Sequence, residues 1–269
     1  MTGAAGPIPS ERRVAWVEDA FLDVLATFEP SSRELLSARA LQQRVDRKFV
    51  LPVWAAGPLL ARLHAGYRVV HTGDKRLARY EDLYFDTPGR DMYHDHHRGR
   101  RPRFKVRIRH HLDRERTFLE VKRKGANDRT TKWRLELPFH ETTLEDDRRR
   151  FIEAHAPLDV ARLTPCLAVA FVRSTLVGVS ADERLTFDWH VEFSQGVRLV
   201  ALAGVVIAEV KQARYRSATS AVDVFRAIHL REQGVSKYCL ATSRLAAVRT
   251  NRFRPALRTV ERLATCENS

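Results

Sequence analysis

Residues 103–109 alternate strictly between charged and apolar side chains. Every odd-numbered position is a cation and every even-numbered position is apolar. Because successive side chains of a β-strand point to opposite faces, this pattern predicts a strand with a row of cations on one face. The four cations are Arg103, Lys105, Arg107 and Arg109. Like charges in a row repel one another, so the pattern indicates an anionic neighbour, either a substrate or solvent counterions.

Similar patterns recur along the chain. Further strands are predicted at residues 42–51, 81–86, 117–124, 131–137, 167–176, 184–188 and 205–211. At least five of the predicted strands carry charges on one face and apolar residues on the other. Apolar residues at helical spacing predict helices at residues 11–28, 52–64, 144–154 and 219–230, with a last short helix after residues 234–240. The histidine-rich residues 94–101 are expected to form a turn.

The repetition of half-charged strands decides between two architectures. In an open sheet, one such face would simply be solvated. Several in succession fit a closed barrel better, because the charged faces then line a lumen and the apolar faces meet helices. We predict an α+β fold in which a closed antiparallel β-barrel of about eight strands forms a charged tunnel, covered outside by amphipathic helices. A flexible leader (1–10), a single domain (11–248) and a basic tail (249–269), frayed or acting as an electrostatic arm, are expected.

Composition narrows the class of partner. The 269 residues include 47 Lys and Arg against 33 Asp and Glu, a net charge of +14, which favours a polyanionic partner. Cys166, Cys239 and Cys266 are far apart and form no CxxC pair, which argues against disulfides or a zinc site and fits a reducing compartment. Uncharged runs such as 199–208 are too short to span a bilayer. We expect a cytoplasmic protein, peripheral at a membrane only through a partner.

Six short motifs occur in a fixed order: RVDRKF at 44–49, YFDT at 84–87, KVRIR at 105–109, LEVK at 119–122, AEVK at 208–211 and SKY at 236–238. The ordered set, between about residues 37 and 248, resembles the VTC domain. This is the polyphosphate polymerase domain of the vacuolar transporter chaperone complex and its bacterial relatives. It belongs to the triphosphate tunnel metalloenzyme, or CYTH-like, fold.

The resemblance implies roles for fifteen side chains. Six cations would project into the tunnel and carry catalysis by binding phosphates: Lys48, Arg107, Arg109, Lys122, Arg173 and Lys237. Seven more would line the tunnel and bind substrate: Arg44, Arg103, Lys105, Lys132, Arg134, Arg184 and Lys211. Glu209 matches the metal-binding glutamate of the family, and Glu120 is a second candidate for binding Mn²⁺ or Mg²⁺.

The implied activity is transfer of the ATP γ-phosphoryl group to a growing inorganic polyphosphate chain, with a membrane protein as a potential partner for export. One departure bears on this activity. Related tunnel hydrolases carry Glu-x-Glu-x-Lys on the first tunnel strand, where this chain has Arg44-x-Asp46-x-Lys48. Loss of the first acid removes part of a water-activating metal site, which favours a polymerase over a hydrolase.

Two other functions stay open at this point. One is a triphosphate or tripolyphosphate hydrolase on the same fold, and the other is a non-catalytic polyphosphate or nucleic-acid binding module. Sequence-specific nucleic-acid binding is not expected, and the oligomeric state is left open. No phosphate-binding GxxxxGK[ST] or GxGxxG loop occurs, which disfavours those nucleotide sites. His94, His96 and His97 are interpreted as surface or phosphate-contacting residues, Asp86 as a turn former and Tyr84 as a packing residue.

Overall fold

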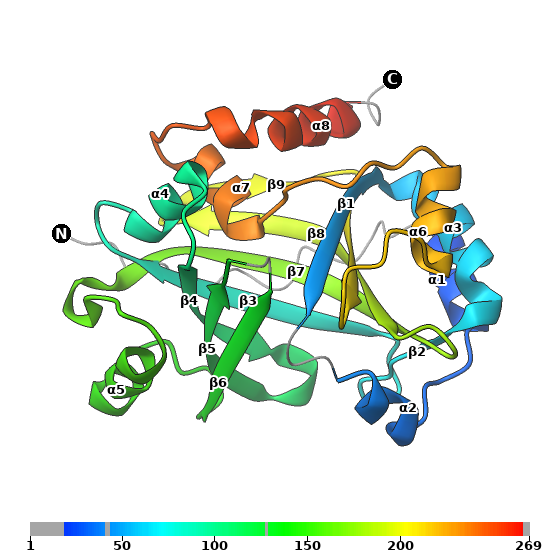
Figure 1. Ribbon diagram of the computed structural model, residues 1–269, viewed down its shortest axis with the longest axis horizontal. Helices are drawn as coiled ribbons and strands as arrows, with labels where there is room; N and C mark the ends of the chain where they lie inside the picture. Colours follow the sequence, from blue (N-terminus) through cyan, green and yellow to red (C-terminus); the bar gives the residue numbers. More distant parts are fainter. Residues whose placement is uncertain (1–18, 41–43, 127–128, 266–269) are drawn as a thin grey trace.

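The computed structural model describes residues 19–40, 44–126 and 129–265. One curled antiparallel sheet forms its centre (Figure 1). Along its main path the strands follow the order β1 (Val45–Pro52), β10 (Val205–Gln212), β8 (Glu183–Gln195), β7 (Thr164–Gly178), β3 (Leu77–Asp86), β4 (Arg103–His111), β5 (Arg116–Lys124) and β6 (Thr130–Leu137). Off this path, β2 (Tyr67–Val69) pairs with β7 and β9 (Arg198–Ala201) pairs with β8.

The two ends of the sheet, β1 and β6, meet at one isolated antiparallel bridge between Arg44 and Thr130. There the Thr130 N–H donates to the Arg44 carbonyl at 3.1 Å. The main path therefore has eight strands and curls until its edges touch, which confirms the predicted antiparallel barrel. Among the residues that the structure describes, the closing contact is a single bridge and not a continuous ladder.

Eight α-helices are present among the described residues: α1 (Asp19–Thr27), α2 (Arg33–Ala38), α3 (Ala56–Leu63), α4 (Asp91–Arg98), α5 (Asp146–His155), α6 (Ser220–Ala227), α7 (Lys237–Leu245) and α8 (Arg254–Thr265). Two apolar clusters attach helices to the outer face of the sheet. Phe49 of β1 packs edge-on against Phe225 of α6, with ring centroids 4.7 Å apart, and α1 and α3 join this cluster. On the other half, Ile152 of α5 packs in a cluster with Val106 and Val121. The apolar faces of the strands thus point outward.

A third apolar cluster occupies the inner face at one end of the barrel. Val169 and Phe171 of β7 share an alternating face with Arg173, and they pack in a cluster with Tyr238 of α7 and Val260 of α8. Helix α7 thus differs from the helices that cover the outside, since it packs against the inner face at one end of the barrel. The inner face is apolar where α7 and α8 close one end, and it is charged along the remaining length.

Helix α4 replaces the turn that we expected at residues 94–101. The Asp86 carboxylate is fully buried and accepts hydrogen bonds from the N–H groups of Met92 at 3.0 Å and Tyr93 at 3.1 Å. These are groups of the first helical turn, which have no partner within the helix. Asp86 is therefore a helix cap. The sequence did not predict α4 because this helix is polar on nearly every face.

The basic tail is also more ordered than predicted. Residues 254–265 form α8, in which Ala256, Val260 and Leu263 are buried against the barrel. A frayed end or free arm was the wrong prediction for this segment, because its helical spacing of apolar residues was hidden among arginines. The leader 1–10 and the start of the helix predicted at 11–28 lie outside the described residues. Within the described ranges, no helix combines the length and the apolar character needed to cross a membrane.

Candidate active site

The inward-facing side chains of the strands surround one cavity of about 1060 Å³. It reaches α4 and the start of α7 at one end and α2 at the other, and these helices lie at opposite corners of the barrel (Figure 1). Among the described residues that line it, 20 are Arg or Lys and four are Asp or Glu. The cavity is therefore strongly cationic along its whole length.

All fifteen side chains singled out from the sequence line this one cavity. The strands bring most of them together because each contributes alternate positions of its charged face, whereas Lys237 comes from the start of α7. Of the other residues considered, His96 and Tyr84 also line the cavity, so Tyr84 is more than a packing residue. Its hydroxyl accepts a hydrogen bond from Arg107 at 3.0 Å, and burial raises its pKa to about 12.

A buried ion-pair network joins β3, β4, β5 and β6 on one side of the cavity. Asp82 accepts hydrogen bonds from Arg109 at 2.5 and 2.7 Å and from Arg107 at 2.8 Å. Arg107 also donates to Glu120 at 2.5 and 2.8 Å, and Glu120 accepts from Lys132 at 2.8 Å. Asp82 is 0% exposed and was not predicted as a site residue. The network holds both arginines in fixed orientations.

Charge states in this network follow from burial and pairing. Burial raises the pKa of Asp82, but the attraction of Arg107 and Arg109 outweighs it and leaves the pKa at about 2. Lys122 is in the opposite situation: burial and the positive charge of Arg107 hold its pKa well below the ordinary value. Within the described part of the chain Lys122 has no ion pair. It is a desolvated amine beside other cations, which an anion would stabilise.

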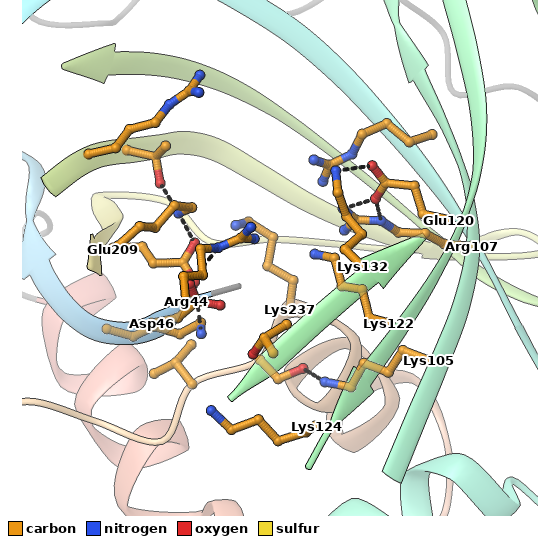
Figure 2. A pocket seen from close by; sticks show the side chains of 18 of the residues that line it. Arg44, Asp46, Lys105, Arg107, Glu120, Lys122, Lys124, Lys132, Glu209 and Lys237 are labelled. Atoms are coloured by element: carbon orange, nitrogen blue, oxygen red, sulfur yellow. Dashed lines mark hydrogen bonds and ion pairs between the residues drawn. The ribbon is translucent and has the colours of Figure 1, made fainter. Parts of the chain in front are cut away.

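A second cluster lies on the other side of the cavity, where β1 pairs with β10. Glu209 accepts from Lys48 at 2.9 Å and from Lys211, while Asp46 accepts from Arg44 at 2.8 Å. In Figure 2 Glu209 and Asp46 lie across the cavity from Glu120. Burial lowers the pKa of Lys211 to about 7, against the opposing effect of Glu209. The charge of this lysine therefore depends on pH near neutrality.

Asp188 of β8 fixes the remaining two predicted catalytic cations. It accepts from Arg173 at 2.5 and 2.7 Å and from Lys237 at the start of α7. Arg173 and Lys237 also lie over the ring of Phe171, at 5.1 and 4.6 Å from its centre. Burial raises the pKa of Asp188, but the charges of Arg173 and Lys237 outweigh this effect and hold the pKa well below its ordinary value. Like Asp82, this carboxylate positions two cations from below the cavity surface.

Carboxylates are the cavity side chains that could bind a divalent cation. No group of three or more His, Cys, Asp and Glu side chains that could hold a metal occurs among the residues described. Asp46 and Glu209 are diagonal neighbours on paired strands, since Asp46 pairs with Lys211 and Lys48 pairs with Glu209. Mg²⁺ is commonly held by one or two carboxylates together with substrate phosphates. The donor set fits a cation that arrives with phosphate, and Glu120 is the less accessible ligand, since its side chain is 2% exposed against 14% for Glu209.

A closed β-barrel whose lumen combines many cations with few carboxylates defines a tunnel protein suited to a phosphate-rich anion. The chain belongs to the VTC domain family, because the model of that domain matches residues 43–246. This confirms the resemblance drawn from the motifs. Comparison with curated proteins gives no match.

Two solved structures illustrate how far the similarity extends. A candidate adenylate cyclase from Bacillus halodurans has 12% sequence identity and a TM-score of 0.48, over 77% of this chain and 100% of that chain. A candidate adenylyl cyclase from Hippeastrum, described as having a dominant triphosphatase activity, has 17% identity and a TM-score of 0.48, over 76% of this chain and 97% of that chain.

Proposed function

We propose that the chain is a polyphosphate polymerase that transfers the γ-phosphoryl group of ATP to the end of an inorganic polyphosphate chain. The observation that carries the proposal is the continuous cationic cavity, in which Lys122 is desolvated beside other cations and forms no ion pair among the described residues. Membership of the VTC family supports the same conclusion. A thin phosphate chain matches such a cavity in both charge and shape.

The proposed reaction needs positioning and charge neutralisation more than covalent help. A terminal oxygen of the acceptor chain attacks the γ-phosphorus, the bond from that phosphorus to the β,γ-bridging oxygen breaks, and ADP leaves. The acceptor oxygen is already anionic, so no general base is required. Arg107 and Arg109, held by Asp82, bind phosphoryl oxygens without having to reorganise. A divalent cation, Mn²⁺ or Mg²⁺, held by Glu209 and Asp46 would neutralise further phosphate charge.

A hydrolase on the same fold is the second candidate, and the carboxylates argue against it. Attack by water requires a free general base to remove its proton, whereas attack by an anionic phosphate acceptor does not. The cavity carboxylates Asp46, Glu120 and Glu209 each accept bonds from a cation in the structure. Arg44 also occupies the position that is acidic in related hydrolases. These features favour a phosphate acceptor over water.

The test uses purified protein with ATP and Mn²⁺ or Mg²⁺, and it follows long-chain polyphosphate on a gel together with free phosphate. We expect polyphosphate to accumulate. Free phosphate without chain growth would indicate the hydrolase, and polyanion binding without turnover would indicate the binding module. Either result refutes the proposed polymerase.

Lys122→Ala sharpens this test because Lys122 has no ion pair to lose within the described residues. We expect the variant to be at least as stable as the wild type and to lose chain growth. Lys75→Ala is the matched control, since Lys75 is 67% exposed in its side chain and does not line the cavity. It should leave both properties unchanged.

A further inference from the structure

The end of the chain contributes to the cavity although it lies beyond the family match. The VTC match ends at residue 246. The short 3-10 helix η6 (Asn251–Phe253) and α8 follow, and Arg252 and Phe253 line the cavity beside α4. We call this end, formed by His96, Arg101, Arg103, Lys105 and Arg252, the α4 mouth. The segment therefore adds to the cavity a cation, Arg252, that lies outside the family match.

Packing fixes this segment in place. Phe253 is 3% exposed, and its ring centroid lies 5.6 Å from that of Tyr93 and 5.3 Å from that of His96. The Tyr93 hydroxyl donates to the Arg249 carbonyl at 2.8 Å. Since Phe253 is anchored, the position of its neighbour Arg252 is defined as well. The buried Phe253 ring is also unable to stack on a nucleotide base, which points away from recognition of a base here.

Arg252 lies directly against the end of α4. A Cβ atom placed on Gly99 would be 2.8 Å from the Arg252 Nη1, so a side chain at position 99 would push the guanidinium away. Gly99 also has a φ of +75°, a conformation that favours glycine and ends the helix. Arg252 itself is exposed, and within the described ranges no carboxylate pairs with it. Its guanidinium lies at the cavity entrance with its donors available.

The α4 mouth is positively charged, since four of its five residues are Arg or Lys and the fifth, His96, is neutral. Burial, together with the positive charges of Lys105 and Arg252, lowers the pKa of His96 to about 2. Arg103 donates to Nε2 of His96 at 3.2 Å, so the proton of the neutral ring resides on Nδ1, 2.9 Å from the Cys239 Sγ. Lys105 donates to the Ser236 hydroxyl at 2.6 Å. His96 therefore orients Arg103 without adding charge.

We propose that Arg252 forms an additional phosphate subsite at the α4 mouth, which makes the protein prefer linear polyphosphate over a triphosphate. The inference rests on the proposed function insofar as the cavity holds a phosphate chain. A triphosphate occupies the clamp around Arg107, Arg109 and Lys237, whereas a longer chain extends to the mouth and gains the contact with Arg252. The substrate class is thus a linear polyphosphate of more than three phosphates.

The experiment measures dissociation constants for tripolyphosphate and for a polyphosphate of tens of residues at one fixed, near-physiological salt concentration, without ATP. Arg252→Ala should weaken binding of the long chain about fivefold and leave tripolyphosphate binding unchanged, as expected for one charge-assisted contact at a partly exposed site. Arg258→Ala removes the same charge from an exposed position on α8 that does not line the cavity, so it controls for general electrostatics. Arg252→Lys should retain part of the preference.

Three outcomes overturn the subsite: equal losses for both ligands with Arg252→Ala, no loss for either ligand, or an Arg258→Ala variant that behaves like Arg252→Ala. These outcomes are distinguishable from failure of the proposed function. If the wild type binds neither polyanion, the phosphate cavity itself is refuted. If the wild type makes polyphosphate but Arg252→Ala binds the long chain normally, the subsite alone is wrong.

Discussion

Asp82→Asn tests whether a buried carboxylate holds the clamp arginines. Asp82 is 0% exposed and accepts from both Arg107 and Arg109. The substitution keeps the size of the side chain and removes its charge. Arg107 retains Glu120, but Arg109 loses the one carboxylate that pairs with it among the described residues. The perturbation therefore leaves a buried cation without compensation.

The magnitude follows from the pKa of Asp82, which is lowered from 3.8 to about 2. Each unit corresponds to about 1.4 kcal/mol, so ionised Asp82 stabilises the folded state by about 2.5 kcal/mol. The stranded Arg109 raises the expected loss toward about 3 to 4 kcal/mol. Because the pKa is lower in the folded state, this stabilisation is present above about pH 4 and disappears as the pH falls through about 2.

The assay is chemical unfolding of the wild type and Asp82→Asn at about pH 7, 4 and 3. The difference in the free energy of unfolding should be about 3 kcal/mol near pH 7 and shrink by about half near pH 3. Glu136→Gln is the control, since Glu136 forms an exposed ion pair with Arg116 and its loss should leave the free energy of unfolding nearly unchanged. A loss below about 1 kcal/mol, or a difference that does not change with pH, refutes the reasoning.

Three further substitutions probe the site and its support. Lys211, with a pKa of about 7, loses its charge as the pH rises. Tripolyphosphate binding should therefore weaken several-fold between about pH 6 and pH 8. In a binding titration, Lys211→Met should make tripolyphosphate affinity nearly independent of pH over this range. Asp188→Asn frees Arg173 and Lys237 without removing a cation; we expect kcat to fall roughly tenfold in steady-state assays, with tripolyphosphate binding at least as tight. Val260 is 2% exposed, so Val260→Ala should lower the free energy of unfolding by about 2 kcal/mol in denaturant titrations, and an unchanged midpoint would contradict the packing of α8.

Much of the barrel was predictable because a half-charged strand has an unmistakable period of two. The inward faces of β4, β5 and β6 follow directly from that alternation, and so does the cavity that they share. Strands β2 and β9 were missed because segments of three and four residues are too short to establish a period. Helix α4 was missed because Met92 and Tyr93 are adjacent and the rest of the helix is polar, so no apolar stripe at helical spacing is visible.

The carboxylates show where sequence reasoning stops. Asp82 and Asp188 stand at alternating positions of predicted strands, so their inward direction could have been read from the pattern. Their partners could not, because Arg107 and Arg109 lie on a neighbouring strand and Lys237 comes from a helix 49 residues further along the chain than Asp188. Pairing of this kind depends on register and on the path of the chain.

The pairing of β1 with β10 has a consequence for protein synthesis. Val45 lies opposite Gln212, so the two strands that carry Lys48 and Glu209 come from distant parts of the chain. Lys237 follows later still. A nascent polypeptide leaves the ribosome from its N-terminus, so Lys48 is synthesised long before its partner Glu209. A translation product that stops before residue 237 lacks Lys237, so the complete phosphate clamp cannot form until most of this sequence has been made.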